Sequence, residues 1–581
     1  MRKGIGPQMN ADKRRCFGRM SAFLCLLTPI AVLAWNGTSR IRFGEIANRA
    51  KVQPTHHTRR FGGKNGDVLR MFTSGGAAVA VGDYDNDGLD DMFVTDSDNG
   101  RKSHLYHNDG NLTFTEVTEA AGVGGGNDPL SIVADAVWLD YDNDGWVDLL
   151  VARFGTPILY HNEHNGKFKD VTAGSGLNKF GNTIAAIAFD YDNDGKLDLM
   201  FGNYFKPENL LDLKTPHVLP NDLDNAVNGG GVTLWKGDGK GHFVETTAKA
   251  GFSKHTGWTL DIGHGDFNND GWQDIYLACD YGTDRLYMNN GNGTFTEVTE
   301  KAIGFDTKKG MNVDIADYDN DGWLDIYVTN ITDEYMKECN MLWHNNGDGT
   351  FTDLSKETGT CATLWGWAAK FGDFDNDGWQ DLFVVNGLRS ASKENYIPVL
   401  VNMITKPGVD FSDVNNWPHI GEMTWSGYQK KKMFRNLGTQ AFKEISGAAG
   451  VDNDKDGRGI GMADFDNDGR LDLYQTNADQ PALLYHNQTE GAGNWVELKL
   501  IGVKSNRDAI GARVTLKAGG QSMIREVNGG NGYSGQSSLR LHFGIGAATK
   551  IDSVEIRWPS GVVQKEALAA NKITKITESG R

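Results

Sequence analysis

One short sequence pattern carries most of the chemistry that this chain could perform. In "VAVGDYDNDGLDDMFVTD" (79–96), Asp83, Asp85, Asp87 and Asp91 crowd between two apolar runs. Side-chain oxygens at loop positions 1, 3, 5 and 9 converge on one point, and the glycine at position 6 supplies the backbone angle that a tight turn needs. Several charged oxygen ligands on one loop suit Ca²⁺ better than zinc or copper. Mg²⁺ comes second, because it prefers fewer protein ligands and stricter octahedral geometry.

The loop is repeated along the chain with the same internal spacing. Its seven copies start at Asp83, Asp140, Asp190, Asp266, Asp317, Asp373 and Asp464. The starts are 57, 50, 76, 51, 56 and 91 residues apart. A period near 50 residues with strand-like flanks indicates a propeller or a similar array. Seven copies in phase also argue against the alternative that these are ordinary solvated acidic turns.

The predicted metal ligands are the side chains at positions 1, 3, 5 and 9 and the backbone carbonyl at position 7. In the first four loops they are Asp83, Asp85, Asp87, Leu89, Asp91; Asp140, Asp142, Asp144, Trp146, Asp148; Asp190, Asp192, Asp194, Lys196, Asp198; and Asp266, Asn268, Asp270, Trp272, Asp274. In the last three they are Asp317, Asp319, Asp321, Trp323, Asp325; Asp373, Asp375, Asp377, Trp379, Asp381; and Asp464, Asp466, Asp468, Arg470, Asp472. We therefore expect up to seven structural Ca²⁺ ions. The fourth site is expected to be weaker, because Asn268 replaces a carboxylate.

An EF-hand begins with the same letters but requires a bidentate Glu at loop position 12. Here position 12 is occupied by Val94, Val151, Phe201, Leu277, Val328, Val384 and Gln475, none of which can serve. The loops also lead into strands, so the EF-hand is excluded. A similar stretch, "DNDKDG" at Asp452, has Ile460 at its ninth position and is not counted as a metal loop.

Two further elements repeat in phase with the loops and must position them. An apolar run and then "LYHN" or a variant follow each loop, at Leu105, Leu159, Leu234, Leu286, Leu342, Met433 and Leu484. A turn then leads to a phenylalanine strand, at Phe114, Phe168, Phe243, Phe295, Phe351 and Phe442. The missing seventh phenylalanine is Phe43, upstream of the first loop. We therefore predict an all-β fold, a seven-bladed β-propeller whose N-terminal strand closes the last blade and removes its exposed edges.

The segments after the last repeat predict a small all-β C-terminal domain. "NWVELKL", "ARVTLKA", "SLRLHFG" and "SVEIRWP" alternate polar and apolar residues between glycine-rich turns. The boundary is placed near Glu490, so the propeller spans 41–489 and the C-terminal domain 490–581.

The N-terminus predicts export. Six basic residues precede position 20, and the mostly apolar run 20–35 follows, with a small residue at Ala34. This is typical of a secretory signal peptide, 1–34, although an uncleaved signal anchor is the alternative. Either way, we expect a secreted, periplasmic or cell-surface protein. Cys339 and Cys361 could then form a disulfide with Cys279 left over, or all three could be buried thiols.

With these residues laid out, the chain resembles the extracellular FG-GAP-like (VCBS-type) repeat proteins, which include the calcium-bearing propellers of integrin α-subunits. The segments 506–546 and 550–564 are similar to the ASPIC/UnbV domain. The combination resembles bacterial relatives of cartilage acidic protein. This resemblance implies a secreted calcium-binding propeller used for adhesion or partner binding, and it transfers no catalytic residue.

Two of the spacings are long because insertions occupy 204–231 and 388–432. Long insertions between regular strands often carry function. Trp417, Trp425 and Tyr428 are the candidates for contact with an extracellular protein or a glycan. The alternative is that these aromatics pack the insertion onto the propeller. The histidines of the "LYHN" segments and the tryptophans at loop position 7 are interpreted as structural.

An enzyme is the competing class of function, because propellers also host hydrolases and lyases. The sequence contains no nucleophile elbow, zinc-type His cluster or phosphate loop. An extracellular polysaccharide-acting enzyme would have to use insertion residues, for example His217 with Asp222. The net charge of −18 argues against a nucleic-acid partner. A membrane is expected as a partner only through the possible N-terminal anchor.

Overall fold

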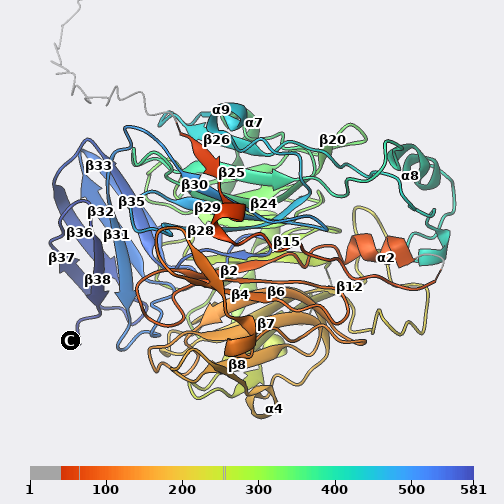
Figure 1. Ribbon diagram of the computed structural model, residues 1–581, viewed down its shortest axis with the longest axis horizontal. Helices are drawn as coiled ribbons and strands as arrows, with labels where there is room; N and C mark the ends of the chain where they lie inside the picture. The colour runs from red at the N-terminus through yellow and green to blue at the C-terminus, as the bar shows by residue number, and fades with distance from the viewer. Residues whose placement is uncertain (1–40, 64–65, 253, 256, 581) are drawn as a thin grey trace, which may run out of the picture. The chain divides into compact units, whose positions relative to one another are not determined.

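The computed structural model describes residues 41–63, 66–252, 254–255 and 257–580 (Figure 1). Strands dominate this part of the chain and its helices are short, so the predicted all-β class is confirmed. The expected signal peptide or anchor, 1–34, lies outside the described residues. None of the helices in the described ranges is long and apolar enough to cross a membrane.

The first repeat shows how the sequence pattern becomes a four-stranded antiparallel unit. Its strands β2 (Val79–Gly82), β3 (Asp91–Val94), β4 (His104–Asn108) and β5 (Phe114–Glu116) pair in chain order. The acidic loop joins β2 to β3, "LYHN" lies on β4 and the phenylalanine on β5. Strands β2 and β3 are buried throughout, which explains their continuous apolar runs.

Five more units in the described residues repeat this order. Their strands are β6 (Ile132–Leu139), β7 (Asp148–Gly155), β8 (Ile158–Asn162), β9 (Phe168–Asp170); β10 (Gly181–Phe189), β11 (Asp198–Phe205), β12 (Gly229–Gly237), β13 (Phe243–Glu245); β14 (Thr259–Gly265), β15 (Asp274–Cys279), β16 (Arg285–Asn289), β17 (Phe295–Glu297); β18 (Asn312–Ala316), β19 (Asp325–Thr329), β22 (Met341–Asn345), β23 (Phe351–Asp353); and β24 (Gly366–Gly372), β25 (Asp381–Asn386), β26 (Lys432–Asn436), β27 (Phe442–Glu444). The second and third units are joined in one sheet by pairing of β10 with β7.

One further unit takes its outer strand from the start of the described chain. Strands β28 (Gly457–Ala463), β29 (Asp472–Asn477) and β30 (Leu483–Asn487) are completed by β1 (Phe43–Glu45). Phe43 lies opposite Asn487 in this pairing and is buried. Its ring packs edge-on against Phe374, 5.5 Å between centroids, which belongs to the preceding acidic loop. The first and last repeats of the propeller are thereby joined without a covalent link.

Each phenylalanine strand is followed by a single helical turn. These turns are α1 (Ala47–Ala50), α3 (Thr118–Ala121), α4 (Thr172–Ser175), α5 (Thr247–Ala250), α6 (Thr299–Ala302), α7 (Ser355–Thr358) and α9 (Ser446–Ala449). Outside this pattern lie α2 (Gly66–Phe72), the β20–β21 hairpin (Thr332–Asp333 and Met336–Lys337), and α8 (Ile397–Ile404) and the 3₁₀ turn η1 (Val414–Asn416) of the second insertion.

The C-terminal strands form two sheets, drawn in blue in Figure 1. One contains β31 (Asn494–Ile501), β35 (Leu541–Gly546) and β38 (Ile573–Thr577); the other contains β32 (Arg513–Ala518), β33 (Gln521–Glu526), β36 (Ile551–Arg557) and β37 (Val563–Glu566). Their buried residues share one hydrophobic cluster with the propeller, in which Leu498 and Ile510 join Leu139 and Ala188. Strand β34 (Gly535–Gln536) pairs with β2 of the propeller itself.

The cysteines follow the first of the two alternatives that the sequence left open. Cys339 and Cys361 form a disulfide, with their Cα atoms 4.8 Å apart. Cys279 is a buried free thiol.

Candidate metal centres

The first acidic loop brings its carboxylates together as the spacing predicts. One oxygen from each of Asp83, Asp85 and Asp91 lies within 4.8 Å of the others. The turn is held by its own carboxylates, because Gly88 N–H donates to Asp83 (3.2 Å) and Leu89 N–H donates to Asp87 (2.8 Å). Asp91 begins β3 and is fully buried. The same hydrogen bonds from positions 6 and 7 recur in the other six loops.

Some of the loop oxygens are buried without a hydrogen-bond partner among the described residues. They include Oδ1 of Asp83, Asp192, Asp319 and Asp466. Buried polar atoms in folded proteins nearly always have a partner. These atoms are carboxylate oxygens at loop positions 1 and 3, which is the kind of ligand that Ca²⁺ takes. The side chains present therefore fit a calcium ion, although the metal itself and the carbonyl ligands at position 7 stay predictions.

Burial makes these clusters costly to ionise. It raises the pKa of Asp140 to about 8, with the Asp508 carboxylate as the second cause. It raises the pKa of Asp148 to about 9 and that of Asp317 to about 8, and neighbouring loop carboxylates add to both. A bound divalent cation would reverse this balance by favouring the charged carboxylates.

These pKa shifts predict how stability depends on pH. In the folded chain the pKa values of these carboxyls lie above the unfolded value near 3.8. Between about pH 4 and 9 the folded calcium-free chain therefore holds more protons than the unfolded chain does. Calcium-free protein should therefore become less stable as the pH rises through this window.

Protons compete with calcium for the same carboxylate oxygens of the acidic loops. The calcium-induced rise in Tm should accordingly be larger at pH 8 than at pH 6, measured by calorimetry on metal-stripped protein with and without added calcium. An equal or larger rise at pH 6 would contradict this account.

In six of the seven "LYHN" segments the third residue contacts the acidic loop of its own unit; in the fourth segment it is Met288. His107 Nδ1 lies 3.3 Å from Asp91 and 3.4 Å from Asp85. Comparable contacts join His161 to Asp148, Lys236 to Asp194, His344 to Asp325, Arg435 to Asp375 and His486 to Asp472. The sequence interpretation called these histidines structural and missed this contact. Their repetition in phase with the loops was the available signal. The lysine and the arginine of this set partly offset the negative charge of their loops.

Position 4 of the loop has a role that the sequence analysis also missed. It is Asn in all seven loops, and its side-chain amide donates to the backbone carbonyl of the position 6 glycine in the next loop. The seven bonds are Asn86–Gly145, Asn143–Gly195, Asn193–Gly271, Asn269–Gly322, Asn320–Gly378, Asn376–Gly469 and Asn467–Gly88. The last bond returns to the first loop. The acidic loops are therefore linked in a closed circle of hydrogen bonds, which we call the asparagine ring.

Asparagine suits this position for a second reason. All seven residues have left-handed backbone angles, with φ between 51° and 61°. Asn tolerates this conformation better than other residues with a Cβ, apart from Asp. The Asn that ends "LYHN" adds a bond in the opposite direction around the circle: Asn108 donates to Phe465 O (2.9 Å) and Asn162 to Tyr84 O (2.8 Å).

Breaking one link of the asparagine ring should have a measurable cost. We expect Asn320→Ala to lower the free energy of unfolding by about 1–3 kcal/mol, because it removes a hydrogen bond and places Ala in a left-handed conformation. Asn320→Gly separates the two causes, since Gly accepts the angle and loses only the bond. In urea unfolding, the free energy of unfolding of the Gly variant should lie between those of wild type and the Ala variant. Wild-type stability of both variants would show that the bond contributes nothing.

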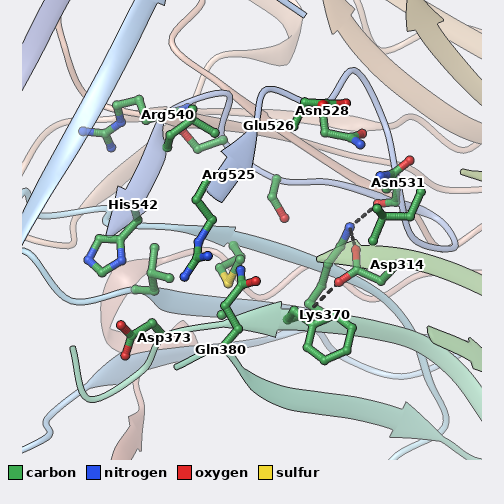
Figure 2. A pocket seen from close by; sticks show the side chains of 18 of the residues that line it. Asp314, Lys370, Asp373, Gln380, Arg525, Glu526, Asn528, Asn531, Arg540 and His542 are labelled. Atoms are coloured by element: carbon green, nitrogen blue, oxygen red, sulfur yellow. Dashed lines mark hydrogen bonds and ion pairs between the residues drawn. The ribbon is translucent and has the colours of Figure 1, made fainter. Parts of the chain in front are cut away.

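A glycine-rich loop of the C-terminal domain, Asn528–Ser538, contacts the first strand of every propeller unit. Gly529 O accepts from Ala188 N–H of β10 (3.0 Å), and Asn531 Oδ1 accepts from His264 N–H of β14 (3.0 Å). Lys370 of β24 donates to Asn531 O and pairs with Asp314 of β18 (Figure 2). The remaining contacts are Tyr533 N–H donating to Asn312 of β18 (3.0 Å), Gln536 with Trp138 of β6, Ser538 with Met462 of β28, and the pairing of β34 with β2.

The close approach of this loop explains its glycines. A Cβ on Gly529 would lie 1.8 Å from Ala188 O, and a Cβ on Gly535 would lie 2.4 Å from Ile460 O. Neither separation is sterically possible. Beside the loop is a cavity of about 150 Å³ lined mostly by polar residues, among them Arg525, Glu526 and His542 (Figure 2).

The predicted contact residues of the second insertion separate into two groups. Trp417 and Trp425 are each only 5% exposed, and their indole N–H groups donate to Phe411 O (2.9 Å) and Tyr335 Oη (3.1 Å). Their burial corrects the expectation of an outward contact surface and matches the packing alternative. Tyr428 is 54% exposed and remains a candidate.

Comparison with known protein families confirms the resemblance of the repeats and of the C-terminal domain. The model of the FG-GAP-like repeat matches residues 73–136, 140–201, 266–328 and 332–384, and the ASPIC and UnbV model matches 502–581. Cartilage acidic protein 1 of Mus musculus is 27% identical over 343 residues, which cover 58% of this chain and 47% of the relative. The Homo sapiens protein is 27% identical over 349 residues, covering 58% and 46%. This chain thus spans about half the length of the curated relatives that it matches.

Two solved structures show a weaker likeness. A lectin of Agrocybe aegerita that recognises non-reducing terminal N-acetylglucosamine matches with a TM-score of 0.36 and 16% identity, over 70% of this chain and 86% of that chain. The exotype rhamnogalacturonan lyase YesX matches with a TM-score of 0.27 and 11% identity, over 74% and 91%. Likenesses this distant say nothing about what this chain binds or does. The chain therefore carries FG-GAP-like repeats and an ASPIC and UnbV domain, and it is a homologue of cartilage acidic protein 1.

Proposed function

We propose that this protein is an exported calcium-binding propeller that acts as an adhesion module for an extracellular protein or glycan. Calcium is structural in this proposal. The observation that carries it is the set of buried loop oxygens that have no hydrogen-bond partner in the described part of the chain, on loops that the asparagine ring links together. Each ion would be held by four side chains and one backbone carbonyl, and it would neutralise a carboxylate cluster that otherwise repels itself.

The disulfide supports export. Cys339 and Cys361 are bonded, and such bonds persist in oxidising compartments but are rare in the reducing cytosol. The homology to cartilage acidic protein 1 agrees with an extracellular location.

The geometry of the first insertion favours binding over catalysis. His217, the histidine considered for an acid–base pair with Asp222, lies instead against Ser412 (3.2 Å) and Asp410 (3.3 Å). Asp222 uses its carboxylate to accept the backbone N–H groups of Asp224 and Asn225. No hydrogen bond or ion pair joins the two residues within the described ranges. The polysaccharide hydrolase or lyase considered as the alternative thus loses its suggested pair.

Metal content tests the calcium part of the proposal. Native mass spectrometry of protein dialysed against calcium should show several bound ions, up to seven. Asp319→Ala should remove one ion. Asp454→Asn, in the "DNDKDG" stretch that lacks the ninth ligand, is the matched control and should keep the full number. Protein that retains no calcium under these conditions would overturn the proposal.

Binding tests the adhesion part. An array of glycans and envelope proteins, probed with and without calcium, should reveal saturable binding that requires calcium and leaves the ligand chemically unchanged. Calcium-dependent cleavage of a polysaccharide, abolished by substitutions in the insertions, would instead establish the enzyme.

A further inference from the structure

A cavity of about 80 Å³ lies apart from the acidic loops and is lined by aromatic and aliphatic side chains. Nine lining side chains are aromatic, and they include Tyr204 and Trp417 of the two insertions, Trp367 of β24 and Tyr533 of the glycine-rich loop. None of the predicted calcium ligands is among its lining residues. The cavity is therefore a second site, built where the insertions meet the first strands of the propeller.

The rings of this cavity are held by the protein. The indole N–H of Trp367 donates to Gly387 O (2.9 Å), and that of Trp417 donates to Phe411 O (2.9 Å). Tyr533 packs against Trp367 with 5.1 Å between ring centroids, so the C-terminal domain supplies part of the wall. Side chains anchored in this way lose little further freedom when a ligand binds.

The two charged side chains in the cavity lining, Asp280 and Lys309, differ in how they are paired. The half-buried carboxylate of Asp280 accepts the Tyr204 hydroxyl, but among the described residues no Lys, Arg or His nitrogen lies within 4.0 Å of it. Burial raises the pKa of Asp280 to about 6, so the group is mostly ionised at pH 7.5. Lys309, the cation in the lining, is already paired with Asp224 (3.3 Å) and Glu338 (3.4 Å). Lys309 therefore acts on the Asp280 charge only at longer range, and Asp280 has no ion-pair partner among the described residues.

A donor in the lining is also unused. The indole Nε1 of Trp365 is buried and has no hydrogen-bond partner among the described residues. Its N–H can only donate, so it suits a hydroxyl or carbonyl oxygen on a ligand.

We propose that this cavity binds a small alkylated ammonium ion that also carries a hydroxyl group. Aromatic faces attract a cation with apolar substituents, and the Asp280 carboxylate, which has no ion-pair partner among the described residues, supplies the opposite charge. A primary ammonium ion would lose its strong hydration in such a site, whereas a methylated one has apolar surface to bury. This site goes beyond the proposed adhesion function and does not depend on calcium ligands.

The test compares choline with 3,3-dimethyl-1-butanol, its uncharged carbon isostere, by isothermal titration of calcium-loaded protein. Because the two molecules have the same shape, their affinity ratio reports recognition of charge. We expect choline to bind at least tenfold more tightly. Asp280→Asn should reduce choline affinity at least tenfold and leave the isostere unchanged. Asp212→Asn, an exposed carboxylate outside the cavity, is the matched control and should change neither.

The wild-type affinity ratio needs no variant, so the proposal stays testable even if Asp280→Asn does not fold. Equal affinity for choline and the isostere would overturn it, and so would failure of folded, calcium-loaded protein to bind either one. Loss of choline binding on Asp212→Asn as well would also contradict the assignment of Asp280. Calcium content is measured separately, so each proposal can fail without the other.

Discussion

Removal of calcium is expected to lower the Tm of this protein more than any single substitution. Seven loops concentrate carboxylates that are buried and repel one another when ionised. An ion present at 100 times its Kd stabilises the folded chain by about 2.7 kcal/mol per site. Several occupied loops would therefore contribute on the order of 10 kcal/mol, which is as large as the whole stability of many domains. Scanning calorimetry of the full chain, in excess calcium and after chelation, measures the effect.

Loop variants show whether the effect comes from the predicted sites. Asp319→Ala should lower the Tm in calcium but have a much smaller effect after chelation, because the stabilising ion is then absent from both proteins. Asp454→Asn should behave like wild type in both conditions. An identical wild-type melting curve with calcium and with chelator would refute the structural role of the metal.

The second large effect is expected at the glycine-rich loop. Gly529→Val should destabilise the protein by about 4 kcal/mol or more, in the range reserved for severe core disruption. A Cβ at this position would lie 1.8 Å from the backbone oxygen of Ala188, so the loop or β10 must move. Movement of the loop would also disturb its contacts with the first strands of the other units. Urea unfolding followed by tryptophan fluorescence measures the change.

Gly62→Val is the matched control, because nothing lies within 4 Å of a Cβ at that position and its backbone angle is ordinary. This variant should unfold close to wild type, within about 0.5 kcal/mol as surface substitutions usually do. If Gly529→Val unfolds at the same urea concentration as Gly62→Val, the insertion of the loop among the first strands does not stabilise the fold.

Local patterns were enough to predict the elements and the loops. The ligand spacing of "DYDNDGLDD" predicts a turn that gathers carboxylates, because residues within nine positions of one another determine their own geometry. The alternating C-terminal strands were predictable for the same reason. The phase of three repeated elements also identified Phe43 as the missing strand, and in the structure that strand pairs with β30.

Contacts between distant segments were decided only by the tertiary structure. The Asn at position 4 is visible in all seven loops, yet its partner lies one repeat away, so its role appears only when neighbouring units pack together. Burial likewise turned Trp417 and Trp425 from exposed candidates into packed residues, because helix α8 and the rest of the insertion fold over them.

By itself, then, the sequence determined the repeat, the acidic loops and the strand order, since short-range spacing and side-chain alternation govern turns and strands. It could not determine where the glycine-rich loop goes, because Gly529 and Ala188 are hundreds of residues apart and only backbone approach joins them. The sequence could not predict the cavity around Asp280 either, because Asp280, Trp365 and Tyr533 form no motif along the chain. They line one cavity only when packing brings them together, and there the Asp280 carboxylate has no ion-pair partner among the described residues.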